Sequence, residues 1–311
     1  WEDELNKIAS VAAGLGTSSA AGPLVMLLGM LFFALNDAMG KWLVSSYGLG
    51  QVILIRSIAA LVILSPLLWK AGLAPILGAE RKGMQLARVI FSTAEVFCFY
   101  YAVMYLPLAD VMTFWLAAPI YVAAASPLLL GESVGWRRWT AIAIGFVGVI
   151  ITLEPSSAMF TGPAIISIIG SAAFAFMMIS GRFLRATPDS TLVLFQTSAA
   201  ALAGLVFAPF DWAPIASGVD LMLLCLLGVV AMSAHMLVNR ALKMSDAATV
   251  APLQYTLLLY AVIFGWMFFG DVPRLSMMIG AGLIVASGLF IFIREQMLKK
   301  RQPADRPVEI P

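Results

Sequence analysis

A small set of polar side chains lies inside long apolar segments of this 311-residue chain. A charge at the centre of a lipid bilayer costs about 2.5–3.5 kcal/mol on insertion scales, so each such residue needs a specific reason to be there. Ligand contact, proton transfer and ion pairing are the reasons to consider. The set consists of Asn36, Asp37, Arg56, Glu95, Gln196, His235, Asn239 and Gln254.

Two of these charges match in depth. Asp37 and Arg56 each lie about six residues, or roughly 9 Å, from the same end of consecutive antiparallel helices. Their positions predict a structural ion pair. A role in substrate binding or gating is the alternative for either residue. Loss of one partner would leave a lone buried charge, so a mutation of either residue would have a severe effect under both interpretations.

Glu95 falls near the middle of the third apolar segment, with no obvious partner at the same depth. It could carry a proton, hold the ammonium group of an amino acid, or stay protonated and bond to a neighbouring helix. His235 and Asn239 lie one helical turn apart in the eighth segment, on one helix face. They could bond a solute or help a proton move, and helix packing remains open for both.

Aromatic residues form the second candidate group. Trp115 aligns with Gln254, and Tyr121 with Tyr260, when the two halves of the chain are superposed. Flat apolar walls with a few polar anchors are typical of a site for an aromatic amino acid. Ordinary packing is the alternative for each ring. The remaining candidates for this substrate site are Asn36, Phe99, Tyr101 and Phe176.

The composition indicates which elements must position these residues. Hydrophobic residues make up 61% of the chain and charged residues 12%, with a mean hydropathy of +0.95. Soluble domains carry roughly 25% charged residues, and a membrane-spanning helix needs roughly 20 apolar ones. The segments lack the alternation of a β-barrel wall. We predict an all-α integral membrane protein with about ten transmembrane helices, at 23–43, 50–69, 84–105, 108–130, 134–153, 162–184, 190–209, 219–241, 247–269 and 275–293.

The chain also repeats itself. Residues 102–132 recur at 241–271, so that Gly131 and Glu132 meet Gly270 and Asp271. A unit of five spans is odd in number, so the second copy enters the membrane inverted, an arrangement suited to alternating access. We predict two inverted five-helix repeats around a central cavity. The predicted divisions are an N-terminal tail at 1–21, repeats at 22–154 and 155–294, and a tail at 295–311.

The basic residues predict the orientation. Most of the connecting lysines and arginines fall on the side that holds both termini, whereas the opposite side has little beyond Lys41 and Arg274. The positive-inside rule therefore places both termini in the cytoplasm, with the tail at 295–311 cytoplasmic. The net charge of +2 serves topology and gives no reason to expect nucleic acid as a partner.

Signals for other functions are missing from the sequence. There is no phosphate-binding glycine loop, no paired metal-ligand motif and no nucleophile with a base, so we expect neither an enzyme nor a cofactor or metal. Cys98 and Cys225 both fall within spans and are expected to be apolar filler. A channel or membrane scaffold is the alternative from another class. The polar residues are too scattered for a continuous channel.

The order of the motifs points to a family. Residues 102–107 lead into a helix with Pro119 that ends at Gly131 and Glu132, and 240–243, Pro252 and 270–271 repeat this order. The chain resembles EamA-type transporters of the drug/metabolite transporter superfamily, and within it the YddG-type aromatic amino-acid exporters. The resemblance covers nearly the whole hydrophobic chain.

This resemblance implies a ten-helix exporter of the bacterial inner membrane that moves aromatic and other bulky amphipathic amino acids by alternating access. Its partners would be a small-molecule substrate and the lipid bilayer, and it would work without a cofactor, as a monomer. Transport would be driven by the substrate gradient alone or by proton exchange through Glu95 or His235. The alternative is the same fold moving another metabolite, such as other amino acids, a nucleobase or a cationic drug.

Overall fold

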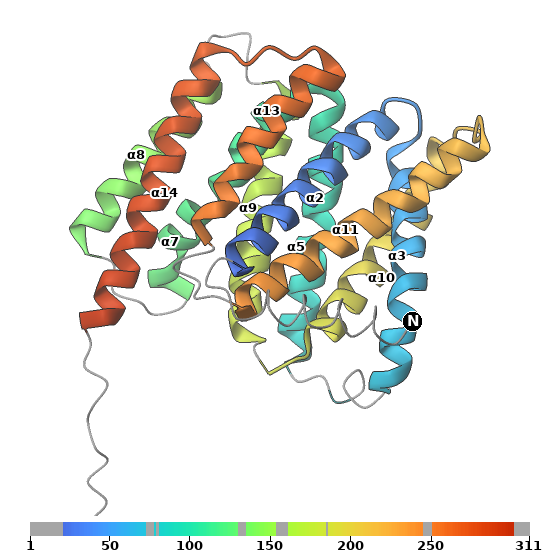
Figure 1. The fold of residues 1–311 in the computed structure, drawn as a ribbon, viewed down its shortest axis with the longest axis horizontal. Coiled ribbons are helices and arrows are strands. Elements are labelled where there is room, and N and C mark those ends of the chain that lie inside the picture. The colour runs from blue at the N-terminus through green and yellow to red at the C-terminus, as the bar shows by residue number, and fades with distance from the viewer. Residues whose placement is uncertain are drawn as a thin grey trace, which may run out of the picture.

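The structure is a computed structural model that describes residues 21–72, 78, 81–129, 135–153, 161–184, 186–244 and 251–301. Its described elements are all helices (Figure 1). They are α2 (Ala21–Val44), α3 (Leu49–Ala71), α5 (Lys82–Tyr105), α6 (Leu108–Leu116), α7 (Ala118–Leu129), α8 (Trp136–Leu153), α9 (Gly162–Phe183), α10 (Asp189–Phe207), η1 (Ala208–Phe210), α11 (Gly218–Met244), η2 (Ala251–Tyr255), α13 (Thr256–Phe269) and α14 (Leu275–Arg301).

Eight of the described helical segments are long and apolar enough to cross a membrane, with α6 and α7 together forming one of them. A shorter apolar helix covers Leu253–Phe269, and α8 adds an 18-residue, mostly apolar helix between two of the spans. Within the described residues these segments fall at the positions predicted for ten spans. The fold class, an all-helical multi-pass membrane protein, is therefore confirmed.

Equivalent helices of the two halves pack in equivalent ways. At the repeat offset α2 corresponds to α9, and α5 to α11. Helix α2 packs along α11, and α9 packs along α5, so one packing occurs twice. Helices α3 and α10, which correspond to each other, also pack together, as do α8 and α14 at one edge of the bundle (Figure 1). The sequence repeat is thus matched by a repeat in helix packing.

Small residues allow the closest of these approaches. A side chain at Gly148 would collide with the carbonyl of Gly280, and one at Gly280 would collide with the carbonyl of Gly148. Glycine therefore lets the backbones of α8 and α14 touch, which is how many helices associate in a bilayer. Gly29 in the same way accommodates Val238 at the α2–α11 contact.

The fourth span is broken at its centre. Helix α6 ends at Leu116 and α7 begins at Ala118, two residues after it, next to Pro119. The Ala117 N–H bonds to the Phe114 carbonyl, a tighter turn than the α-helix allows. The matching span of the second half begins with the 3-10 turn η2 before α13. Broken helices at membrane depth are found where the backbone lines a site or a cavity.

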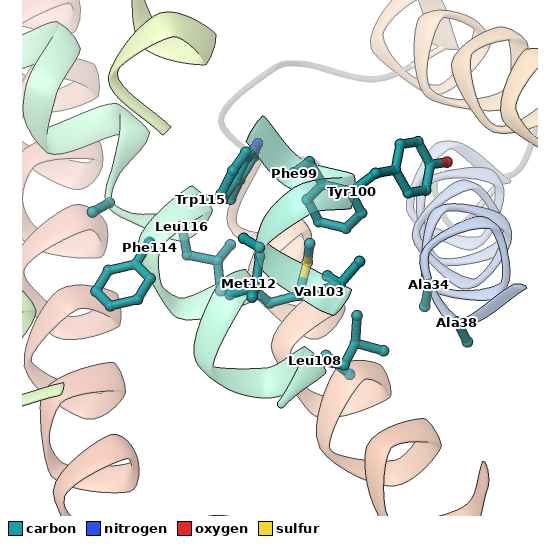
Figure 2. Close-up of a cluster of buried hydrophobic side chains, with 14 of the residues drawn as sticks. Ala34, Ala38, Phe99, Tyr100, Val103, Leu108, Met112, Phe114, Trp115 and Leu116 are labelled. Atoms are coloured by element: carbon teal, nitrogen blue, oxygen red, sulfur yellow. The ribbon is translucent and has the colours of Figure 1, made fainter. Parts of the chain in front are cut away.

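The core lies where α2, α5 and α6 meet (Figure 2). Phe99, Tyr100 and Val103 of α5 pack there with Met112 and Trp115 of α6. The Tyr100 ring reaches from α5 towards α2, where it occupies the space that a side chain at Gly40 would fill. This core places Tyr100 and Trp115 beside the polar residues predicted from the sequence.

Candidate functional site

Polar side chains from five helices meet beside this core. We call them the central cluster: Asn36 and Asp37 of α2, Arg56 of α3, Glu95 and Tyr100 of α5, Trp115 of α6, and His235 of α11. Hydrogen bonds join three neighbouring pairs of these residues. Arg56 lies near enough to Asp37, Glu95, Tyr100 and His235 for its charge to influence each of them.

The predicted ion pair between Asp37 and Arg56 is not formed as a direct contact. Asp37 accepts a hydrogen bond from the Asn36 amide at 3.0 Å, and Arg56 donates to the Tyr100 hydroxyl at 2.5 Å. The guanidinium carbon also lies 5.2 Å from the centre of the Tyr100 ring. The two charged residues lie at matching depths, as predicted. The Arg56 guanidinium, however, bonds to the Tyr100 hydroxyl and not to Asp37.

Glu95 has the partner that the sequence did not reveal. The Trp115 indole N–H donates to its Oε1 at 2.8 Å. Trp115 lies at the C-terminal end of α6, beside the helix break, and packs edge-on against Phe99 at 5.2 Å. The second oxygen of Glu95 has no protein partner in the described part of the chain, and the side chain is only half-buried. The carboxylate is therefore partly accessible.

His235 is an accessible side chain between buried neighbours. Ala234 and Met232 on the same helix are 0% and 6% exposed, whereas the histidine is exposed. Its ring meets Phe33 edge-on at 4.8 Å, and the charges of Arg56 and Arg88 act on it. His235 thus presents its imidazole on the accessible side of the central cluster. The side chain of Asn239, one turn later, lies outside the described side chains.

Asn36 offers an acceptor as well as a donor. Its side chain is 6% exposed, and while its amide nitrogen serves Asp37, its Oδ1 has no hydrogen-bond partner among the described residues. An unsatisfied buried acceptor costs about 1–3 kcal/mol. A donor group on a ligand would remove that cost.

Other predicted aromatic residues do not join the cluster. Each instead contacts a ring of its own surroundings, at centroid distances of 5.1 to 6.4 Å. The contacts pair Tyr101 with Tyr105, Tyr121 with Phe146, Phe176 with Phe91 and Tyr260 with Phe264. Gln254 lies half-buried in η2. This turn begins the span that is equivalent, in the second repeat, to the span that holds Trp115. Of the aromatic candidates, the cluster therefore includes Trp115, with Phe99 packed against it.

Two further residues of this region were not among the candidates. Tyr100 is 1% exposed and binds Arg56. Arg88 donates to the Met177 carbonyl of α9 at 2.8 Å. Tyr100 stands in an aromatic-rich stretch that gives no polar signal, although Gly40, a repeated glycine, marks the space that its ring needs.

Within the membrane-spanning helices, the central cluster contains two carboxylic acids, Asp37 and Glu95, and the guanidinium of Arg56. Asp37 and Glu95 are suited to a cationic group, and Arg56 to an anionic one. Among the described residues, His, Cys, Asp and Glu side chains do not come together in threes in an arrangement that could hold a metal ion. The arrangement is suited to recognising a small amphipathic molecule with both kinds of charge beside a flat ring.

Comparison with known proteins gives the same class. The model of the EamA-like transporter family matches residues 20–154 and again 162–293. A riboflavin transporter of Vibrio cholerae serotype O1 is 28% identical over 90% of this chain and 96% of its own length. An S-adenosylmethionine uptake transporter of Rickettsia felis is 24% identical over 89% of this chain and 94% of its own length.

A pseudopaline exporter of Pseudomonas aeruginosa is 24% identical, with 86% of this chain and 94% of the relative covered. A solved crystal structure with 16% sequence identity matches the fold with a TM-score of 0.61, over 91% of this chain and all of that chain. These named relatives do not support the closer likeness to YddG-type aromatic amino-acid exporters. Their names describe a transporter, an uptake transporter and an exporter, for three different small molecules.

Proposed function

Because the chain belongs to the EamA-like transporter family, we propose that it is a secondary transporter for an amphipathic metabolite that combines a flat aromatic ring with an ammonium group. The central cluster is the substrate site. The observation that carries this proposal is the Trp115–Glu95 hydrogen bond, because it places an accessible carboxylate beside an indole at a broken helix. Aromatic amino acids are the substrates that this pair suits best.

In the proposed complex, the substrate ammonium binds the free oxygen of Glu95. Its carboxylate faces Arg56, whose guanidinium keeps unused donors after bonding Tyr100. The ring lies against Trp115 and the exposed face of His235. Asn36 completes the site, because its unpaired Oδ1 accepts a second ammonium hydrogen.

Riboflavin is the second candidate substrate, favoured by the 28% identical riboflavin transporter that spans most of this chain. Riboflavin has a larger flat ring system and no ammonium group. It would use the aromatic wall and the hydrogen-bonding groups but not the charge of Glu95. The two candidates therefore make different demands on the same carboxylate.

The two repeats, at 22–154 and 155–294, move against each other to expose this site to either side in turn. We place the protein in the bacterial inner membrane, with both termini in the cytoplasm, on the distribution of its lysines and arginines. The substrate gradient, or protons carried by Glu95 or His235, drives net flux. Export is the proposed direction for aromatic amino acids.

Counterflow in proteoliposomes tests the substrate class. Vesicles of purified protein loaded with unlabelled tryptophan, phenylalanine, alanine or riboflavin are offered the labelled form of the same compound. We expect labelled tryptophan and phenylalanine to accumulate transiently and alanine to stay at the level of protein-free vesicles. Accumulation of riboflavin alone would replace the amino-acid assignment, and equal accumulation of alanine would contradict an aromatic site.

A further inference from the structure

Two ion pairs close one end of the helix bundle. Lys41, in the last turn of α2, lies 2.8 Å from Asp271 in the connection between α13 and α14. Arg274 of the same connection lies 2.6 Å from Asp110, in the first turn of α6. Lys41 and Asp271 are partly buried, with side chains 14% and 24% exposed, and Asp110 is almost fully buried.

The pairs are reciprocal between the two halves of the chain. The first half supplies the cation Lys41 and the anion Asp110, and the second half supplies the anion Asp271 and the cation Arg274. Lys41 also donates to the Leu106 carbonyl at 3.1 Å. Each ion pair therefore joins one repeat to the other, and neither holds a repeat together internally.

The backbone fixes Asp271 in the position that this contact needs. Gly270 has a φ of 68°, and the N–H groups of Gly270 and Asp271 bond to the carbonyls of Trp266 and Gly265. This is the helix-ending turn that favours glycine at the left-handed position. It directs the Asp271 side chain back towards the end of α2. Asp110 is held at the N-terminal end of α6, where the helix dipole favours a carboxylate.

The same residues explain an exception in the charge pattern. Lys41 and Arg274 are the basic residues that the sequence places on the side opposite the termini, where the positive-inside rule disfavours them. Both have a carboxylate of the other repeat as a partner. Pairing across the repeats therefore accounts for keeping two cations on that side.

We propose that Lys41, Asp110, Asp271 and Arg274 form an outer latch, which closes the site on the side opposite the termini and must break for the site to open there. This inference rests on the proposed alternating access of the repeats. With the latch closed, His235 in the central cluster is still exposed. The latch is then one of the contacts that decide which side is open.

Thiol labelling measures this opening without any substrate. A reporter cysteine is introduced as His235→Cys in a background with Cys98→Ser and Cys225→Ser. Membrane-impermeant maleimide is then added to the outer face of oriented vesicles. We expect Lys41→Asp or Asp271→Lys, each of which places like charges together, to raise the outer labelling rate by about tenfold. Lys41→Asp combined with Asp271→Lys restores the pair and should return the rate towards that of the background protein.

Ion pairs that only stabilise the fold, without controlling opening, would give a different result. Lys41→Asp would then lower the unfolding temperature without changing the outer labelling rate, and that result would overturn the latch. Lys41→Met, which removes the charge without adding repulsion, serves if the reversals fail to insert, and it too should increase outer labelling. If labelling rises as expected but counterflow finds no aromatic substrate, the substrate assignment fails and the latch stands.

Discussion

The Trp115 indole N–H donates a hydrogen bond to Glu95 Oε1 at 2.8 Å, and this joins the break of the fourth span to the middle of the third. A charge-assisted bond of this kind fixes the carboxylate so that its second oxygen faces away from Trp115. In the proposed site, this bond would couple substrate binding at Glu95 to the position of α6. Movement at the α6–α7 break would move the carboxylate's partner, which links binding to a conformational change.

Trp115→Phe should keep the aromatic surface but remove the indole N–H. Hydrogen bonds to charged groups contribute about 1.5–3 kcal/mol, so we expect the apparent KM for tryptophan to rise by about tenfold or more. Trp266→Phe is the matched control, because that indole is 66% exposed on α13. An unchanged KM in Trp115→Phe would show that the bond does not orient Glu95 for binding.

Glu95→Gln should separate the two candidate substrates. The amide keeps the shape of the side chain but loses the charge that balances an ammonium group. We expect tryptophan counterflow to fall by at least about tenfold, since a hydrogen bond to a charged group contributes roughly 1.5–3 kcal/mol. Riboflavin, which lacks an ammonium group, should be affected much less. Equal losses for both compounds would assign Glu95 a structural role.

Gly40→Ala should disturb the cluster from a distance. The added methyl group would occupy the place of the Tyr100 ring, whose hydroxyl holds Arg56. Overpacking of this kind costs about 1–3 kcal/mol, so the unfolding temperature in detergent should fall and transport should weaken. Gly282→Ala in α14 is the control, because nothing lies within 4 Å of the added carbon. Equal unfolding temperatures for the two variants would contradict this packing.

Gly270→Ala tests how the backbone supports the outer latch. Alanine at a φ of 68° costs about 1 kcal/mol, so the turn that carries Asp271 should shift or loosen. We expect faster outer labelling of the reporter cysteine, and Gly270→Asn should lie closer to the parent because asparagine tolerates this conformation. Gly83→Ala, at an open position with negative φ, controls for the loss of a glycine. Labelling that is identical in all three variants would argue against the latch.

The sequence predicted the fold well because hydrophobicity and repetition are properties of the chain itself. The length of each apolar segment gave the spans, and Pro119 stands where the structure breaks the fourth span. The same logic identified Asp37, Glu95 and His235, since polar groups in apolar segments need a reason. These residues belong to the central cluster.

The partners of these residues were harder to predict. Asp37 and Arg56 match in depth, but the direction of each side chain around its helix decided the contacts, and Tyr100 bonds Arg56 instead. Tyr100 and Tyr101 are adjacent in sequence, yet one is buried in the cluster and the other packs against Tyr105. Aromatic residues serve packing and binding alike, so their type alone could not separate the two roles.

The most direct test of the central claim is saturable uptake of labelled tryptophan into proteoliposomes, compared for the parent protein, Glu95→Gln and Trp266→Phe at equal reconstituted amounts. The account predicts saturable uptake by the parent and by Trp266→Phe, and loss of that uptake in Glu95→Gln. Tryptophan uptake by Glu95→Gln equal to that of the parent would contradict the assignment of the central cluster as the substrate site.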